Sequence, residues 1–375
     1  MYFIFAFLFL ALISRIQAYP GMDKLLGQIH HNHRRQDDEF DGNDSTELIG
    51  DLLTLAEEDL TRVGLDVRNI ILGAVASRTN EAWAREVPDL GTTECAAETC
   101  CVWQYIANDM EAVFREADGR CTALARAAIR LGFHDAGTFS KATGPYGGAD
   151  GSILLAPEEM LRSENTGLQT IAAVTQSWYD KYAPYGISMA DLIQLSSNVA
   201  GVVCPLGPRT RTFVGRVDNS SASPEGLLPS ASSDAATLVE LFKNKTIGPH
   251  GLVALVGAHT TSVQYHTEVE RAGAPQDSTP GVWDVLFYSQ TLETPVDGVF
   301  SFASDLALSQ STGTADEWTS FAYEADAQED WNEDYAREYI RLSLLSVYNI
   351  NDLTECTKVL PPELTNFNQN TTSAK

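Results

Sequence analysis

The sequence is short of basic residues. Its 375 residues include 25 Lys and Arg against 51 Asp and Glu, which gives a formal net charge of −26 at pH 7. A surface that binds nucleic acid needs clustered positive charge, so we expect no nucleic-acid partner. The surplus of carboxylates is typical of a protein that works in an acidic or extracellular setting, and it leaves oxygen ligands for cations.

Long apolar runs are scarce as well. Residues 3–13 form one apolar block, which is too short to span a bilayer comfortably, and no later run is long enough. Arg15 interrupts the block, and residues 16–18 offer a small-residue cleavage site. We therefore predict a secretory signal peptide at residues 1–18 and expect no membrane partner, although the usual positive charge at the start is missing. A buried helix or a membrane anchor is the alternative.

Cysteines are few and lack the paired C-x-x-C spacing that a structural zinc site would need. An even count of six in an exported chain predicts three disulfides instead. Four N-x-S/T sequons support a secreted, extracellular glycoprotein, each weakly because such triplets also arise by chance: Asn43, Asn219, Asn244 and Asn370.

Strand-like alternation is rare, whereas helical periodicity recurs, so the sequence predicts an all-α fold. Residues 19–92 differ in pattern from the rest of the chain, and we interpret them as a pro-segment or N-terminal extension. The basic run His30–Arg35 within them could bind a metal, and residues 48–76 have weak helical periodicity. We expect residues 361–375 to form a disordered tail. The expected helices are 102–117, 121–134, 167–183, 188–200, 234–243, 250–260, 283–292, 301–311, 314–326 and 331–347.

The most informative stretch is Arg130-Leu131-Gly132-Phe133-His134-Asp135. On a helix, Arg130 and His134 project from one face, one turn apart. A permanent cation beside an imidazole that can stay neutral near pH 7 combines an anion stabiliser with a base. An ordinary Arg/His helix surface has the same spacing, so the pair needs support from other segments.

Two loops are rich in oxygen donors and glycine or proline. The first joins Asp135 to residues 147–152, and the second spans residues 277–284. Each could enclose a hard cation, most plausibly Ca²⁺, although each also fits a tight turn with solvated carboxylates. Two single residues also stand out. His259 ends an apolar run, and a lone histidine in that position is more often a core residue than a ligand. Asp305 lies in an apolar helix, where its carboxylate would need a hydrogen-bond partner.

These segments, in this order, resemble the secreted class II fungal haem peroxidases of the plant-peroxidase superfamily. The resemblance covers roughly residues 93–360. It implies the haem-peroxidase fold, with one haem b between a distal lobe (93–215) and a proximal lobe (216–360). It also implies hydrogen peroxide and small phenolic or aromatic donors as partners, two bound Ca²⁺ ions and a monomer.

The resemblance implies roles for both histidines. His259 is the proximal haem-iron ligand, and Asp305 accepts its second ring proton. His134 is the distal base, which takes a proton from hydrogen peroxide and delivers it to the departing oxygen. Arg130 stabilises the charge that develops as the O–O bond breaks.

Further residues match the same family pattern. Phe133 would pack near the distal haem face, and Asn165 would fix the tautomer of His134, with Glu159 behind it. The distal calcium would bind Asp135, Gly148, Asp150 and Ser152. The proximal calcium would bind Thr260, Asp277, Thr279, Val282 and Asp284. The disulfides would be Cys95–Cys101, Cys100–Cys356 and Cys121–Cys204.

Some positions depart from the better-known relatives. Ala123, Ala127 and Tyr265 stand where manganese peroxidases place three acidic residues, and alanine cannot bind a hard cation. Ala254 stands where lignin and versatile peroxidases carry an exposed tryptophan. Gln276 replaces an apolar or aromatic residue near the proximal haem face.

The sequence thus predicts a general haem peroxidase that oxidises phenolic or aromatic donors by one-electron steps at the haem edge, without a manganese site. Two alternatives stay open. One is a high-potential lignin-degrading peroxidase that uses another surface aromatic. The other is a non-catalytic secreted glycoprotein that binds haem or calcium.

Overall fold

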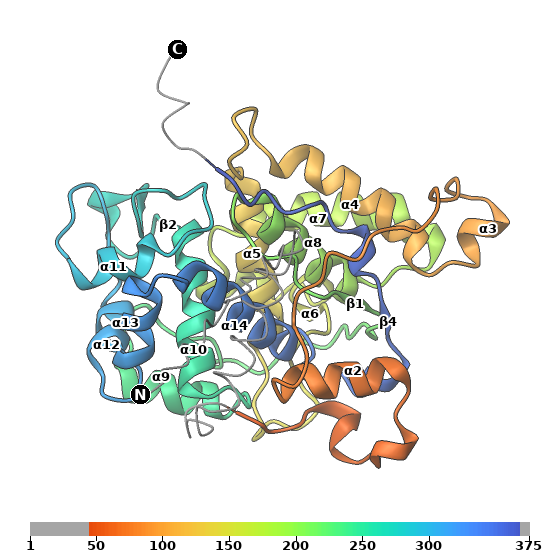
Figure 1. The fold of residues 1–375 in the computed structure, drawn as a ribbon, viewed down its shortest axis with the longest axis horizontal. Coiled ribbons are helices and arrows are strands. Elements are labelled where there is room, and N and C mark those ends of the chain that lie inside the picture. The colour runs from red at the N-terminus through yellow and green to blue at the C-terminus, as the bar shows by residue number, and fades with distance from the viewer. Residues whose placement is uncertain (1–44, 368–375) are drawn as a thin grey trace, which may run out of the picture. The chain divides into compact units, whose positions relative to one another are not determined.

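Helices make up most of the structure, a computed structural model that describes residues 45–367 (Figure 1). The α-helices are α2 (Arg62–Ile71), α3 (Thr93–Ala96), α4 (Cys100–Phe114), α5 (Ala123–Ala136), α6 (Ser152–Leu155), α7 (Gln169–Tyr182), α8 (Met189–Val203), α9 (Ala235–Lys243), α10 (Pro249–Val256), α11 (Leu286–Leu292), α12 (Ala303–Gln310), α13 (Ala315–Tyr323) and α14 (Ala327–Leu342). The prediction of an all-α fold is confirmed, and each expected helix is present with its ends shifted by a few residues. No helix within 45–367 is both long and apolar enough to cross a membrane.

Short 3₁₀ turns and four two-residue strands connect the helices. The 3₁₀ turns are η1 (Gly50–Leu53), η2 (Glu57–Asp59), η3 (Glu159–Leu161), η4 (Ser163–Asn165), η5 (Ala183–Tyr185), η6 (Gly257–Thr261), η7 (Val269–Arg271), η8 (Ile350–Asp352) and η9 (Thr357–Val359). Strand β1 (Phe213–Val214) pairs antiparallel with β4 (Thr354–Glu355), and β2 (Val263–Gln264) pairs antiparallel with β3 (Ala274–Pro275). The second pair closes the loop that follows His259.

Helix α8 is the centre of the packing, because all of its residues from Met189 to Val203 are buried. Helix α5 lies along α8 and can approach closely because position 132 is a glycine. A Cβ on Gly132 would come 2.4 Å from the Tyr339 hydroxyl oxygen and 2.6 Å from the Ser197 Cβ. This close packing holds one face of α5 against α8 and α14 and leaves the face with Arg130 and His134 toward a cavity.

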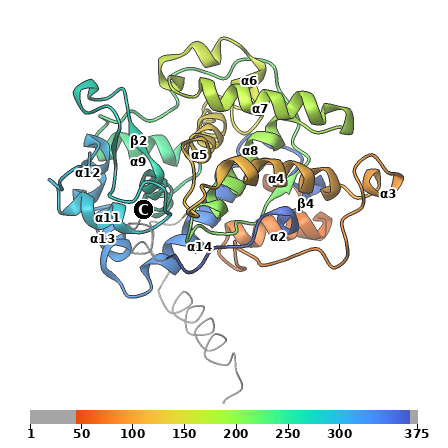
Figure 2. The same cartoon turned by 90° about the horizontal axis from the view of Figure 1, so that it is seen from above.

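The helices of the described chain gather in two groups (Figures 1 and 2). Helices α4, α5, α7 and α8 pack on one another, and helices α9 to α13 form the second group, with α14 packed against α10 and α13. Helix α14 also contacts α2. The boundary between a distal and a proximal lobe at residue 215 stays a prediction.

Part of the predicted N-terminal extension belongs to the packed body. Ile49, Leu52 and Val67 lie in the main apolar core. The buried guanidinium of Arg341 donates hydrogen bonds to the backbone carbonyls of Ser45, Glu47 and Ile71. Residues 45–92 and the residues after 93 therefore pack into one body, although the sequence pattern changes near residue 93. The predicted signal peptide, the run His30–Arg35 and the sequons at Asn43 and Asn370 lie outside the described residues.

The predicted tail is anchored where it begins. The Leu364 carbonyl accepts a hydrogen bond from the Leu206 amide, and the Glu363 carboxylate accepts one from the Arg209 amide. The buried Arg209 guanidinium also donates to the Pro361 carbonyl. The first residues after 360 are therefore held against the protein.

All six cysteines are paired, and the pairs are the three that the resemblance implied: Cys95–Cys101, Cys100–Cys356 and Cys121–Cys204. The second bridge spans 256 residues and ties the start of α4 to the C-terminal segment. The third ties the segment just before α5 to the end of α8. Such long closed loops restrict the unfolded chain most.

Candidate active site

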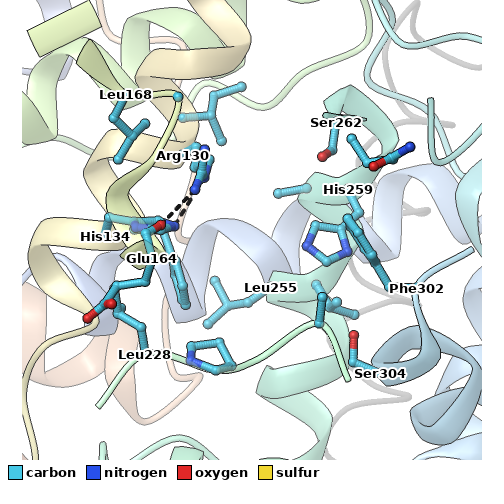
Figure 3. Close-up of a pocket in the computed structure, with 18 of the residues that line it drawn as sticks. Arg130, His134, Glu164, Leu168, Leu228, Leu255, His259, Ser262, Phe302 and Ser304 are labelled. Carbon is cyan, nitrogen blue, oxygen red and sulfur yellow. Dashed lines mark hydrogen bonds between the residues drawn. The ribbon is translucent and has the colours of Figure 1, made fainter. Parts of the chain in front are cut away.

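A cavity of about 1140 Å³ lies between helix α5 and the segment formed by α10, η6 and α12 (Figure 3). This volume exceeds that of typical small-molecule sites, which are roughly 300–1,000 Å³, so the cavity has room for a large cofactor. Arg130 and His134 lie on one wall, and His259 and Phe302 lie on the facing wall. Two segments that are far apart in sequence therefore bring two imidazoles, His134 and His259, to one cavity.

The tautomer of His134 follows from its hydrogen bonds. Its Nδ1 lies 2.8 Å from Asn165 Oδ1. The Asn165 side-chain nitrogen donates to the Glu159 carbonyl at 2.7 Å, which fixes the amide so that its oxygen faces His134. The ring proton is therefore on Nδ1, and Nε2 keeps its lone pair. Burial, together with the Arg130 cation, lowers the pKa of His134 to about 3, so the imidazole is a neutral base.

The guanidinium of Arg130 is fixed by three acceptors. It donates to His134 Nε2 at 3.2 Å, to the Thr166 carbonyl at 3.0 Å and to the Glu164 carbonyl at 2.8 Å. Burial lowers its pKa, but an arginine stays charged at any working pH. The two carbonyls were not predicted, because every residue carries one and the sequence gives no sign of which will face a cation.

Glu159 acts differently from the expectation. Its backbone carbonyl, rather than its carboxylate, contacts Asn165. The carboxylate accepts hydrogen bonds from the Ser223 amide and hydroxyl, both at 2.6 Å, and lies 3.6 Å from Arg162. The side chain thus anchors a neighbouring loop, and the main chain of η3 orients Asn165.

The facing wall centres on His259 in η6. Its Nδ1 lies 3.1 Å from Asp305 Oδ2, and the Ser304 hydroxyl lies 3.3 Å from Asp305 Oδ1. Asp305 is fully buried in the first turn of α12, where the helix dipole favours a negative charge. A carboxylate on Nδ1 makes the imidazole more basic and leaves Nε2 available on the cavity side.

Aromatic rings hold both histidines in place. The His259 ring packs edge-on against Phe287 and Phe302, with ring centroids 5.7 and 5.4 Å apart. Phe133 lies on the cavity wall beside His134, as expected, and stacks on Phe242. The roles of Phe287, Phe302 and Phe242 were missed, because a phenylalanine in a helical sequence gives no signal of its own.

The four expected distal calcium ligands lie in two linked segments next to His134, because Asp135 accepts a hydrogen bond from the Gly151 amide and Asp150 accepts one from the Ser152 amide. Asp135 Oδ1 and the Ser152 hydroxyl are buried and have no hydrogen-bond partner among residues 45–367. Burial raises the pKa of Asp135 well above its usual value, with the Asp150 charge adding to the effect, and burial also raises the pKa of Asp150. Gly148 has φ +103°, and a Cβ there would meet the Leu345 carbonyl. Such orphaned oxygens and mutually repelling carboxylates fit a hard cation.

The five expected proximal ligands form one connected cluster beside His259. The Thr260 hydroxyl donates to Asp277 and lies 3.4 Å from the Val282 carbonyl. The Thr279 hydroxyl lies 3.0 Å from Asp284 Oδ2 and 3.3 Å from Asp277 Oδ1. Burial, with the charge of Asp284, raises the pKa of Asp277 to about 7, and burial raises that of Asp284 to about 6. The donor set of this buried acidic pair fits a divalent cation, which would offset the repulsion between the two carboxylates.

The structure also locates the five positions that depart from the better-known relatives. Ala123, Ala127 and Tyr265 all line the cavity, and the Tyr265 side chain is exposed. Ala254 is buried in α10. Gln276 is fully buried, and its amide atoms have no hydrogen-bond partner among the described residues.

Comparison with known proteins agrees with this geometry. A model of the peroxidase family matches residues 106–324, more than half of the chain and the span that contains both histidines. The chain belongs to the peroxidase family. It is 29% identical to a peroxidase of Coprinopsis cinerea over 320 residues, which cover 79% of this chain and 86% of the relative. It is 30% identical to ligninase C of Trametes versicolor over 318 residues (78% and 83%) and to a peroxidase of Arthromyces ramosus over 290 residues (71% and 77%).

The resemblance to fungal class II peroxidases is therefore confirmed, and this peroxidase is a haem enzyme, an oxidoreductase that acts on hydrogen peroxide. The family match begins inside α4 and ends just after α13. Helix α14 and residues 45–105 lie outside it, although both belong to the packed body of this peroxidase.

Proposed function

We propose that this peroxidase binds one haem b in the cavity between His134 and His259. The observation that supports it is that the two rings have different hydrogen-bond partners. The Nδ1 of His134 faces the neutral amide of Asn165, whereas the Nδ1 of His259 faces the buried carboxylate of Asp305. His259, whose Nδ1 faces the buried Asp305 carboxylate, would hold the iron through Nε2. His134 carries its lone pair on Nε2, beside Arg130, and would act as the base.

The reaction of peroxide would use the distal pair. The haem, when bound, supplies the redox-active iron at which the O–O bond is split. His134 Nε2 takes the proton from the near oxygen of hydrogen peroxide and returns it to the far oxygen, which leaves as water. Arg130 donates a hydrogen bond to His134 Nε2, so its guanidinium would stabilise the negative charge that develops on an oxygen held beside that nitrogen.

The electron donors would be small phenols and aromatic amines that reach the haem edge. Ala123 and Ala127 replace carboxylates on the cavity wall, so we propose that Mn²⁺ is not a donor there. Five of the six tryptophans are buried and Trp83 is half-buried, with its ring beneath Lys358, so none offers an open surface site.

Two Ca²⁺ ions would occupy the oxygen clusters next to the histidines. Asp135 follows His134 and Thr260 follows His259, so each ion would fix the backbone beside one face of the haem. We also propose that the protein is exported and works as a monomer. The signal-like start, the sequons and three disulfides, which persist in oxidising compartments, support export.

One experiment tests the function. The haem-loaded protein, saturated with Ca²⁺, is mixed with hydrogen peroxide in a stopped-flow spectrometer and then with a phenol, a bulky non-phenolic aromatic and Mn²⁺ in turn. We expect a rapid change of the Soret band and turnover of the phenol alone. A Soret band that peroxide leaves unchanged would favour the non-catalytic glycoprotein, and turnover of the bulky donor would favour the high-potential enzyme.

A further inference from the structure

A second group of metal-binding side chains lies away from the cavity, where helices α10, α13 and α14 meet. We call it the His250 cluster, and it consists of His250, Glu317 and Asp334, each from a different helix. Their ligand atoms all lie within 4.8 Å of one another. Neither the haem pocket nor either calcium cluster uses any of the three.

Both carboxylates approach the same atom. His250 Nε2 lies 2.9 Å from Glu317 Oε1 and 3.2 Å from Asp334 Oδ2. A ring nitrogen carries at most one hydrogen, so the two carboxylate oxygens share it in a bifurcated hydrogen bond, which is weaker toward each oxygen than a direct one. Two carboxylates that share one nitrogen in a largely buried place also repel each other.

A bound cation removes both difficulties. Ligand atoms that lie about 2.0–2.2 Å from a zinc ion are about 3.0–3.6 Å apart along the edges of its coordination polyhedron, close to the two distances observed here. The ring faces the edge of Phe321, which limits its rotation. The two oxygens of the Asp334 carboxylate have different neighbours. Arg337 lies 3.7 Å from Oδ1, and Oδ2 faces His250.

We propose that His250 Nε2, Glu317 Oε1 and Asp334 Oδ2 bind a divalent cation of the zinc class. One imidazole and two carboxylates suit a borderline metal such as Zn²⁺ better than Ca²⁺, which prefers six or more oxygens. The side chains of His250 and Glu317 are about one-fifth exposed, so water can reach the ion and complete its coordination. The site is independent of the haem assignment.

The ion would join three helices of the group that carries His259. His250 is the second residue of α10, and α10 leads directly into η6. Helix α14 provides Asp334 and also lines the cavity through Tyr335 and Tyr339. A metal that holds α10 to α13 and α14 would therefore stabilise the wall behind His259.

The same region offers a matched control. Glu324, Asp326 and Asp330 also place three carboxylates within 4.8 Å of one another, but they are mostly exposed and include no histidine. We propose no site there. Glu324→Gln removes one charge near α13, just as Glu317→Gln does, without touching the His250 cluster.

The test measures Zn²⁺ binding to the full-length, haem-loaded, calcium-saturated protein, with ICP mass spectrometry for stoichiometry and calorimetry for the dissociation constant. We expect one Zn²⁺ that Glu317→Gln and His250→Gln weaken at least about 10-fold and that Glu324→Gln leaves unchanged. Zinc should raise the Tm of the wild type and of Glu324→Gln only. An anomalous peak at the zinc edge, between His250 and Asp334, would locate it.

Two results would overturn the proposal. If no zinc binds, the cluster is an ion pair only. If zinc binds equally to Glu317→Gln, it occupies another place, such as the histidines of residues 30–33. If His250→Gln fails to fold, Glu317→Gln still tests the site. The Glu317 side chain is partly exposed, and the Soret band reports whether this variant is folded.

Discussion

Asn165 Oδ1 accepts the Nδ1 proton of His134 at 2.8 Å, while the Asn165 amide nitrogen is held by the Glu159 carbonyl. The orientation of one amide thus decides which nitrogen of His134 carries the lone pair. Asn165 would therefore set up the proposed base without contacting peroxide itself. The first two predictions test this relationship.

Replacing the base itself should separate binding from reaction. In His134→Leu the haem should still bind, because His259 and the cavity wall are unchanged. The second-order rate constant for peroxide, measured by stopped flow, should fall by about 10²–10⁴-fold. Asn165→Ala should keep the imidazole but lose its fixed tautomer, and the rate should fall less than in His134→Leu. Equal rates in the wild type and His134→Leu would contradict the assignment.

The pH dependence of the peroxide reaction follows from the pKa of His134. Burial, and then the Arg130 cation, lower this pKa to about 3. The base is active when neutral, so it is lost only as the pH falls through that value. The rate constant should stay level from pH 7 to about pH 4 and decline below. A decline centred near pH 6.5, the ordinary value for histidine, would mean that His134 is solvated.

Calcium should stabilise the protein more at neutral than at acidic pH. The raised pKa values of Asp277, about 7, and Asp284, about 6, mean that ionising them without a cation is unfavourable. Without calcium, their contribution to stability falls as the pH rises from about 4 to 7. Calcium needs both carboxylates ionised, so its affinity rises over the same range.

Calorimetry with Ca²⁺ and with EDTA checks this expectation. The difference in Tm should be larger at pH 7.5 than at pH 5, and the Soret band should weaken after EDTA. Asp284→Asn should reduce the difference, whereas Asp297→Asn, an exposed carboxylate in a nearby loop, should not. A calcium effect that is the same at both pH values would speak against these ligands.

Asp305→Asn should change the electronic character of the iron ligand. The neutral amide is a weaker acceptor for His259 Nδ1–H, so the imidazole becomes less basic and the haem reduction potential should rise. Potentiometry and the iron–histidine stretching frequency in resonance Raman spectra measure this, and the frequency should fall. Asp297→Asn again serves as the control. Unchanged values would show that Asp305 does not act on the haem through His259.

The sequence predicts those parts of the site that depend on side-chain identity and local spacing. Arg130 and His134 share a face because a helix turns once in 3.6 residues, and the two oxygen-rich loops are recognisable because Asp, Thr and Ser cluster around Gly and Pro. The proposed calcium ligands within these loops came from the family resemblance. The pairing of His259 with Asp305, 46 residues away, came from the family resemblance, since spacing alone does not bring them together.

Other parts could not be predicted because they depend on tertiary contacts. The carbonyls of Glu164 and Thr166 that hold Arg130 carry no residue signature. The packing of residues 45–92 against the rest of the protein was not predicted. Their apolar residues are few and closely spaced, and they are buried through contacts with distant elements such as α14. Glu159 was placed correctly, but its carboxylate had a partner, Ser223, that only the fold reveals.

The three carbonyls around Arg341 have a practical consequence for anyone who produces this enzyme. A recombinant form that starts at Cys95 would remove the backbone acceptors of Ser45, Glu47 and Ile71 from the buried Arg341 guanidinium, which would keep its ion pair with Glu338. The loss of three acceptors by a buried cation is strongly destabilising. Expression plasmids should therefore retain everything from Ser45 onward, and low yields from trimmed versions would have their explanation in this one arginine.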